Sequence, residues 1–595
     1  MPLKKYIFTS RHQLVVLLLL AVGLNINTLF NSYALDDAAV LTENNYVQKG
    51  LKGIPEILSS ELFKGLKDKG AFSNLTEVRY RPLALVLFAV EYQFFGANPM
   101  VSHLINVILF ALLIVLLYEL LHKHLFRKGN TLFPFVVCLL FVVHPIHTEV
   151  VANVKSRDEI ITFIFLLVSL TSFIKYSEAR RTLHLIAGLF CFFLALLTRE
   201  TAVTFIAVLP LVLYFFANRN LKQAILFSIL LLVVFGVYML MRIKIVGFSY
   251  SSATDVLHSP FLLATHSEAF ATKVYILYRY LQLLIFPHPL SFEYGYNQIP
   301  YLQLASVKFI FSMILMVALS AFAFISFKKK PLFSFSIIYF FVTISVGSNF
   351  IIDLGTPMAE RMLFQPSLAF CMAASAVYME IDKRSKLFSN GIFIVILFLF
   401  SCKTYLRNQV WKNNETLVLT DIVSSPNSVY MNYAATELYL LKANNEQDVQ
   451  LKNTYFNNAV VYGKQTLSIY PGFAVAYMNL GSAYYGLQDY FQAGDCWMHA
   501  FGLMPNEPRA KYFVEFLSDV LYKKGNGFSE QGNIDQAIQY YKRSTEMNSR
   551  NVEAWYNLGG NYLLKNDSAA ARESWNKVID MEPTHPLKKE DFIRR

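Results

Sequence analysis

Long apolar runs of about 15 to 20 residues, separated by short basic loops, fill roughly the first two thirds of this chain. A run of that length, folded as an α-helix, can cross the hydrocarbon layer of a membrane. The composition agrees, since 55% of the 595 residues are hydrophobic and the chain contains 52 Phe and 35 Tyr. The sequence therefore predicts an all-α fold in which a polytopic membrane helix bundle comes first.

The order of apolar runs and basic loops predicts about eleven crossings between residues 13 and 405. Basic clusters such as Lys328-Lys329-Lys330 mark cytoplasmic ends, because positively charged loops are retained inside. They put the N-terminus inside and the C-terminus outside. Two further apolar stretches, Pro82 to Phe95 and Val274 to Phe286, are expected to begin and end on the outer side. The net charge of +12 reflects these loops and does not indicate nucleic-acid binding.

After Tyr405 the apolar runs stop and a repeat of about 34 residues begins. The segment Tyr477 to Gly481 matches Trp555 to Gly559, and ten extra residues are expected between about Lys511 and Asn526. Small alanines recur in steps of 34, 44 and 34 residues at Ala459, Ala493, Ala537 and Ala571. The pattern is typical of tetratricopeptide (TPR) repeats, which are stacked antiparallel helix pairs. We expect a membrane domain over residues 1–408 and a TPR solenoid over residues 409–595.

The first outer loop, residues 31–80, carries the adjacent carboxylates Asp36 and Asp37 just past the first apolar run. A carboxylate at the mouth of a membrane domain is a natural catalytic base or cation site, although a solvated loop would look the same. Side chains of adjacent residues on an extended loop point apart, so one of the two should act as base while the other positions the loop. We favour Asp37 as the base.

Arginines at the outer ends of membrane helices run against the usual charge bias and need a reason to be there. They can simply reach the interface with their long side chains, or they can bind a phosphate bidentately. The same face carries further polar groups, which we take as site candidates. The arginines are Arg81, Arg157, Arg199, Arg242 and Arg361, and the other groups are His144, His147, Glu149, Glu200 and Glu360.

Several of these residues fall in short motifs that resemble, in order, those of the transmembrane and TPR repeat-containing proteins, a family of protein O-mannosyltransferases. The resemblance covers the whole chain. Two departures are a shorter repeat array and Arg199, which stands where a lysine is common. The motifs are Leu35-Asp36-Asp37, Tyr80-Arg81-Pro82-Leu83, His144-Pro145-Ile146-His147-Thr148-Glu149, Ser156-Arg157-Asp158-Glu159, Thr198-Arg199-Glu200-Thr201, Glu360-Arg361 and Gln365-Pro366-Ser367.

The resemblance implies a glycosyltransferase of the GT-C class, which transfers a sugar from a polyprenyl- or dolichyl-phosphate donor. It implies that Asp36 or Asp37 is the base and that mannose or a similar hexose passes to Ser or Thr of an exported protein recruited by the TPR array. The short array fits a bacterial inner-membrane protein with a periplasmic TPR domain, or a lumenal one in an ER membrane. No cofactor or metal is firmly implied, although Asp36, Asp37 and His144 could hold a divalent cation. The donor phosphate is assigned to Arg81, Arg199, Arg242 and Arg361.

Two other functions fit parts of the sequence. A non-catalytic membrane anchor for a peptide-binding TPR array would need only one crossing, not eleven. A lipid-linked sugar flippase would place charges along a path through the membrane, whereas here they collect at one face. Both alternatives therefore explain less of the sequence than a glycosyltransferase does.

Overall fold

The computed structural model describes residues 9–67, 79–127, 131–217, 219–247 and 255–585, and every regular element within them is a helix. The all-α fold class is confirmed. The chain divides into two compact units, residues 1–425 and residues 426–595. The first unit runs past residue 408, where the composition changes, because it includes α18 (Asn414–Ser424).

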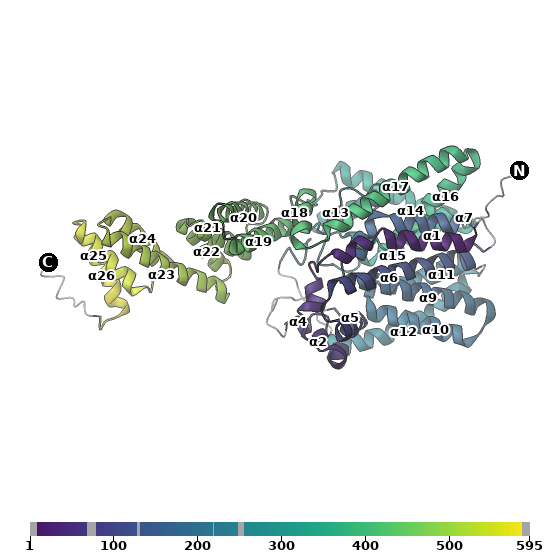
Figure 1. Ribbon diagram of the computed structural model, residues 1–595, viewed down its shortest axis with the longest axis horizontal. Helices are drawn as coiled ribbons and strands as arrows, with labels where there is room; N and C mark the ends of the chain where they lie inside the picture. The colour runs from purple at the N-terminus through teal and green to yellow at the C-terminus, as the bar shows by residue number, and fades with distance from the viewer. Residues whose placement is uncertain (1–8, 68–78, 128–130, 218, 248–254, 586–595) are drawn as a thin grey trace. The chain divides into compact units, whose positions relative to one another are not determined.

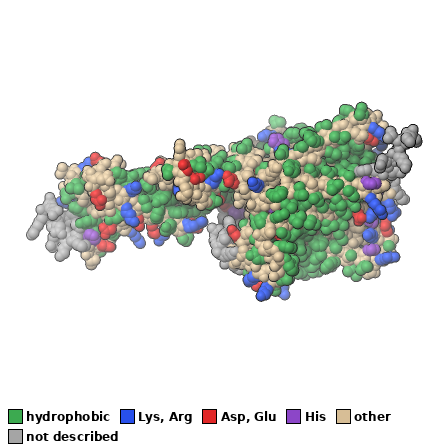
Figure 2. Space-filling view, viewed as in Figure 1, with side chains coloured by type: hydrophobic (Ala, Val, Ile, Leu, Met, Phe, Trp, Pro, Cys, Tyr) green, Lys and Arg blue, Asp and Glu red, His purple; other side chains and the backbone are tan. Residues whose placement is uncertain are grey.

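Among the residues that the structure describes, six helices of the first unit are long and apolar enough to cross a membrane. Many of their apolar side chains are exposed, and the face of this unit seen in Figure 2 is largely hydrophobic. In Figure 1, α6 lies beside α1 and α9. The six are α1 (Ser10–Gly23, extended by a short helix to Phe30), α6 (Pro99–Glu119), α9 (Arg157–Ala179), α12 (Leu221–Val246), α14 (Val307–Ser326) and α17 (Lys386–Val410).

A seventh span exists if α7 (Leu132–Val143) and the helical turns over Pro145–Ala152, which meet at a bend of 54°, count as one. The other four expected spans do not pass the same test of length and apolar composition. The described residues therefore do not confirm eleven crossings. These four spans fall on α10 (Thr182–Thr198), α11 (Phe205–Phe215), α15 (Leu332–Ile344) and α16 (Ser367–Arg384).

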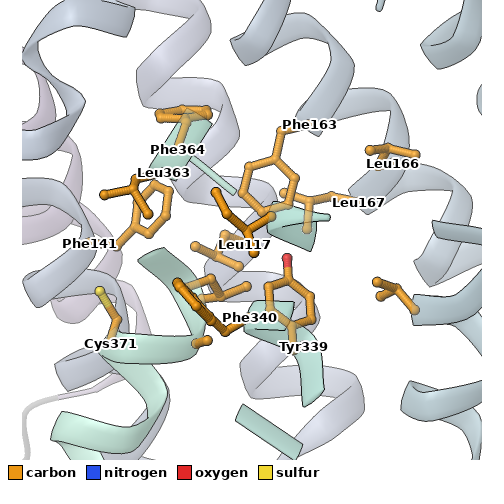
Figure 3. Close-up of a cluster of buried hydrophobic side chains, with 14 of the residues drawn as sticks. Leu117, Phe141, Phe163, Leu166, Leu167, Tyr339, Phe340, Leu363, Phe364 and Cys371 are labelled. Carbon is orange, nitrogen blue, oxygen red and sulfur yellow. The ribbon is translucent and has the colours of Figure 1, made fainter. Parts of the chain in front are cut away.

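The centre of the membrane unit is packed with aromatic and aliphatic side chains from several helices (Figure 3). The rings of Phe141, Phe163 and Phe364 lie 5.7 to 6.3 Å apart, centroid to centroid. The cavity beside Leu117 and Tyr339 has a volume of about 20 Å³, room for about one water molecule. This part of the bundle is therefore closed to any ligand much larger than a water molecule.

The first outer loop folds onto α5 (Pro82–Phe95) through short helices rather than standing free in solvent. Its buried residues, Val40, Val47 and Ile57 among them, form one hydrophobic cluster with Phe88 on α5 and with Val154. This packing brings the loop beside the connection before α9. The short helices are α2 (Asn45–Gln48), α3 (Ile54–Leu58) and α4 (Lys64–Lys67), and residues 68–78 of the expected loop lie outside the described residues.

Antiparallel helix pairs make up the second unit, as the repeat predicts (Figure 1). The extra ten residues lie in α23, which has 23 residues where α21 and α25 have 13 each. The four repeating alanines are at most 1% exposed, so close helix approach explains why they are small. The pairs are α19 (Val429–Asn445) with α20 (Val449–Ile469), α21 (Ala474–Gly486) with α22 (Tyr490–Leu503), α23 (Pro508–Glu530) with α24 (Ile534–Met547), and α25 (Val552–Leu564) with α26 (Ser568–Met581).

The same glycine–tryptophan contact occurs within the second helix pair and within the fourth. A Cβ atom on Gly481 would lie 2.3 Å from the Trp497 indole, and one on Gly559 would lie 2.4 Å from Trp575. Each indole nitrogen also donates to a backbone carbonyl of the facing helix, at 2.9 and 3.0 Å. Each repeated Gly is therefore needed because the indole of a repeated Trp occupies the space where a side chain would lie.

Candidate active site at the outer loop

The loop after α1 holds the two adjacent carboxylates in opposite environments. The Asp36 side chain is 62% exposed, whereas Asp37 is fully buried. Oδ2 of Asp37 accepts a hydrogen bond from the Ala34 amide at 3.0 Å, and Oδ1 accepts one from the Lys155 amide at 2.7 Å. Leu35, with φ at +50°, turns the chain just before the pair. Asp37 therefore ties the loop to the segment before α9, and Asp36 faces solvent.

Cationic side chains surround Asp36. The Lys155 ammonium lies 3.4 Å from its Oδ2, and Arg361 and Arg79 also act on it electrostatically. Desolvation raises the pKa of Asp36, but the three cations outweigh it and hold the pKa below its ordinary value of 3.8. Burial raises the pKa of Asp37 to about 7, against the opposing effect of its two amide donors. Asp36 is thus ionised at neutral pH and open to a substrate.

Arg361 is the candidate arginine that lies in the electrostatic neighbourhood of Asp36. Its guanidinium is 23% exposed and donates to Glu149 at 2.6 Å, and its backbone amide donates to the same carboxylate at 2.8 Å. Glu149 is 3% exposed, so only the arginine of this pair reaches solvent. An arginine held in this way keeps donors free for a further anion.

Arg81 and Arg199, in contrast, are each ion-paired with two carboxylates. Both donate to the same oxygen of Asp158 at 2.9 Å. Arg81 also pairs with Glu200 at 2.8 Å and Arg199 with Glu159 at 2.9 Å. The two arginine side chains are 7% and 3% exposed. This network joins α5, α9 and α10 and leaves little of either arginine for a phosphate.

Arg157 and Arg242 also differ in whether their guanidinium groups are already paired with a carboxylate. Arg157 is buried, pairs with Glu91, and donates to the Asn106 side chain at 2.6 Å and to the Ser102 carbonyl at 2.8 Å. Arg242, near the end of α12, is half-buried, and no ion pair joins it to another described residue. Arg242 is thus available for an anion, whereas Arg157 holds α6 and α9 together.

The two histidines of the bend between α7 and α9 are fully engaged inside the bundle. Nε2 of His144 lies 2.9 Å from the Leu284 carbonyl, while Nδ1 and Nε2 of His147 lie 2.8 Å from the Phe141 carbonyl and the Ser367 hydroxyl. Both rings are at most 2% exposed. No group of three His, Cys, Asp or Glu side chains suited to a metal exists among the described residues. A cation bound by Asp36, Asp37 and His144 therefore has no assembled ligand set in that part of the chain.

Glu360 belongs to a second buried polar group beside the site. It is fully buried, and its Oε1 accepts from the Ser291 amide at 2.6 Å and from the Tyr294 hydroxyl at 2.9 Å. Burial raises the pKa of Glu360 to about 8. The group continues to Asp421, whose Oδ2 accepts from the Phe292 amide at 2.7 Å. Glu360 therefore positions the segment after α13 (His266–Ile285) rather than facing solvent.

Sequence reasoning missed two members of this end of the bundle. Lys155 stands among outer-face residues in the sequence, but its role as the partner of Asp36 depends on the folded loop. Glu293 lies in the outer segment Pro289 to Tyr294, and the charged groups that act on it electrostatically are Arg361, Glu149 and Asp36. A lone charge in an apolar outer segment is the signal that could have found Glu293.

Comparison with known proteins agrees with the resemblance seen in the motifs. Protein O-mannosyl-transferase TMTC3 of Homo sapiens is 23% identical over 641 residues, covering 94% of this chain and 67% of the relative. Protein O-mannosyl-transferase F38B6.6 of Caenorhabditis elegans is 24% identical over 429 residues, covering 71% of this chain and 59% of the relative. This chain is a homologue of the TMTC proteins. It spans about 60% of the length of several such relatives.

The repeats are recognised separately. A tetratricopeptide repeat family model matches residues 522–586. The crystal structure of MamA covers 28% of this chain at 21% identity with a TM-score of 0.17. The apolar helices and the homology together identify a multi-pass membrane protein with a TPR region.

Proposed function

We propose that the protein is a membrane glycosyltransferase that moves a hexose from a polyprenyl-phosphate donor to a Ser or Thr hydroxyl. The observation that carries the proposal is Asp36, an exposed, ionised carboxylate with Lys155 at 3.4 Å and Arg361 nearby. This juxtaposition supplies a base and cations at one place, as transfer from a phosphate requires. The names of the relatives, protein O-mannosyl-transferases, support the same reaction class and favour mannose as the sugar.

The reaction can be written with the residues of this site. The acceptor oxygen attacks C1 of the sugar, its proton passes to the Asp36 carboxylate, and the bond between C1 and the phosphate oxygen breaks. Displacement from the opposite side inverts the configuration at C1. Arg361 and Lys155 stabilise the negative charge that grows on the departing phosphate. The lipid tail of the donor lies along the apolar surface of the bundle.

The preference for Asp37 as base, drawn from the sequence, is replaced by one for Asp36. Both oxygens of Asp37 are occupied by backbone amides, and no surface of its side chain is exposed. A general base must come within hydrogen-bond reach of the proton that it removes. The exposed Asp36 side chain is accessible to an acceptor hydroxyl, while Asp37 holds the loop in the conformation that presents it.

Among the four arginines assigned to the donor phosphate, Arg361 and Arg242 are better candidates than Arg81 and Arg199. The latter two already pair with buried carboxylates. Arg361 retains exposed guanidinium surface beside Asp36, and Arg242 has no ion-pair partner among the described side chains. We assign the phosphate contact to Arg361 first.

The TPR region is proposed to recruit the acceptor, because stacked helix pairs of this kind form extended surfaces that bind peptides and proteins. Both Asp36 and the repeats should then lie on the outer side of the membrane, in the periplasm or the ER lumen. Labelling of single cysteines at Lys52 and at Asp567 with a membrane-impermeant reagent tests this. Both should react in intact cells or sealed vesicles, and reaction of only one contradicts a shared compartment.

The activity itself is tested with purified protein in lipid vesicles, polyprenyl-phosphate mannose and Ser/Thr-containing peptides. Mass spectrometry should find a peptide heavier by one hexose, made by the wild type and not by Asp36→Asn. Mass spectrometry of exported proteins, with and without the gene, identifies the natural acceptors. If the wild type transfers no hexose from any polyprenyl-phosphate donor and exported proteins are unchanged, the protein is not this enzyme.

A further inference from the structure

The segment after α13 is held in place by two buried carboxylates that act through its backbone. The Ser291 amide donates to Glu360 at 2.6 Å, and the Phe292 amide donates to Asp421 at 2.7 Å. Asp421 in turn accepts from the Arg407 guanidinium at 2.7 Å between Nη2 and Oδ2. All three charged side chains are at most 4% exposed. Burying charged groups is costly unless they are paired or hydrogen-bonded. Here the two carboxylates are hydrogen-bonded to two consecutive backbone amides, which fixes the segment in place.

The side chain presented by this fixed segment is Glu293. Its neighbours Phe292 and Tyr294 are 5% and 3% exposed and point into the protein. Glu293 is half-buried, and within the described ranges no Lys, Arg or His lies within 4.0 Å of its carboxylate. A hydrogen bond with the Gly295 backbone acts on this carboxylate, and a carboxylate has about four acceptor sites, so it keeps capacity for a ligand. Because Phe292 and Tyr294 are buried on either side of it, Glu293 is the accessible side chain of this fixed segment.

The electrostatic partners of Glu293 are members of the proposed active site. Besides its own burial, the influences on it are Arg361, Glu149, a hydrogen bond with the Gly295 backbone, and Asp36. Burial raises the pKa of Glu293 to about 7, with Arg361 working against the rise. The hydrogen bond from Ser291, two residues before Glu293, to Glu360, the residue before Arg361, places Glu293 near the cation assigned to the phosphate. Asp36, the carboxylate assigned to the acceptor, also acts on Glu293 electrostatically.

We propose that Glu293 binds hydroxyl groups of the sugar being transferred and so helps to select the donor. This inference rests on the proposed function. In that reaction the sugar lies between the departing phosphate, at Arg361, and the attacking hydroxyl, at Asp36. A group near both ends therefore lies beside the sugar. In its ionised form a carboxylate has only acceptor sites, which suits it to the donor hydroxyls of a hexose.

The test compares two ligands that differ only in the sugar. Dissociation constants for polyprenyl phosphate and for polyprenyl-phosphate mannose are measured with the full-length protein in lipid vesicles. Glu293→Gln should weaken binding of the mannosylated lipid by about 10- to 100-fold, the range for a hydrogen bond to a charged group. It should leave binding of polyprenyl phosphate unchanged. Glu293→Asp, which keeps the charge on a shorter stem, should fall between the wild type and Glu293→Gln.

The matched control is Glu43→Gln, which changes an exposed carboxylate of the first outer loop and should alter neither constant. If Glu293→Gln weakens both lipids equally, Glu293 acts on the phosphate or on the loop, and the inference is overturned. If it weakens neither, the inference is overturned while the proposed function stands. If the wild type binds neither lipid, the proposed function itself fails, and the sugar role of Glu293 fails with it.

Discussion

Exchanging each member of the carboxylate pair for its amide separates a chemical role from a structural one. Asp36→Asn removes the base while keeping the size of a side chain that is 62% exposed and lies 3.4 Å from the Lys155 ammonium. A fully exposed ion pair contributes about 0–1 kcal/mol, and this pair contributes more, because Lys155 is only 6% exposed and would lose its carboxylate partner. Loss of general-base assistance costs about 10²- to 10⁴-fold in rate. We therefore expect at least about 100-fold slower transfer, with only a small fall in melting temperature from the loss of the Lys155 pair.

Asp37→Asn should do the reverse. An Asn side chain has one acceptor oxygen, so one of the two backbone amides that Asp37 now satisfies would face an NH2 group. An unsatisfied buried donor costs about 1–3 kcal/mol. The variant should unfold at a lower temperature, yet its folded fraction should still transfer sugar.

The assay is the initial rate of hexose transfer to a Ser/Thr peptide, measured beside thermal unfolding for each variant. Asp353→Asn is the matched control, because Asp353 is also an exposed carboxylate, 45% accessible, paired with a single lysine, Lys273, at 2.9 Å. It should change neither quantity. Transfer by Asp36→Asn at the wild-type rate would refute the assignment of the base from exposure. Loss of transfer in folded Asp37→Asn alone would show that the roles are reversed.

Three further variants probe the phosphate contact, the buried polar group and the repeats. Arg361→Lys should weaken binding of polyprenyl phosphate, because a point charge replaces a planar fork, and unchanged affinity would remove Arg361 from the donor site. Asp421→Ala leaves the buried Arg407 without its carboxylate and should destabilise the membrane unit by about 3–5 kcal/mol, seen as a lower melting temperature. Gly481→Ala should destabilise the repeats by about 1–3 kcal/mol, because its Cβ would lie 2.3 Å from an indole. Gly502→Ala, an exposed helix position with open space around it, is the control and should be neutral or stabilising when the repeats are unfolded by urea.

The sequence by itself determined that the chain is helical, with apolar helices first and repeated helix pairs after them. Apolar runs identify membrane helices because burial in lipid or protein depends on composition over one segment. The repeated Ala and Gly of the second unit identify helix pairs because each repeat meets the same neighbours. That is why the pairing of Gly481 with Trp497 has its copy at Gly559 and Trp575.

The tertiary structure alone decided which polar groups are free to act. Arg81 and Arg361 look alike in the sequence, but Arg81 meets Asp158, 77 residues away, whereas Arg361 keeps part of its guanidinium exposed. The rotation of each helix about its axis sets such pairings, and no local pattern records it. The same holds for Asp36 and Asp37. Which of two adjacent carboxylates faces solvent depends on the Lys155 amide, more than a hundred residues further along the chain.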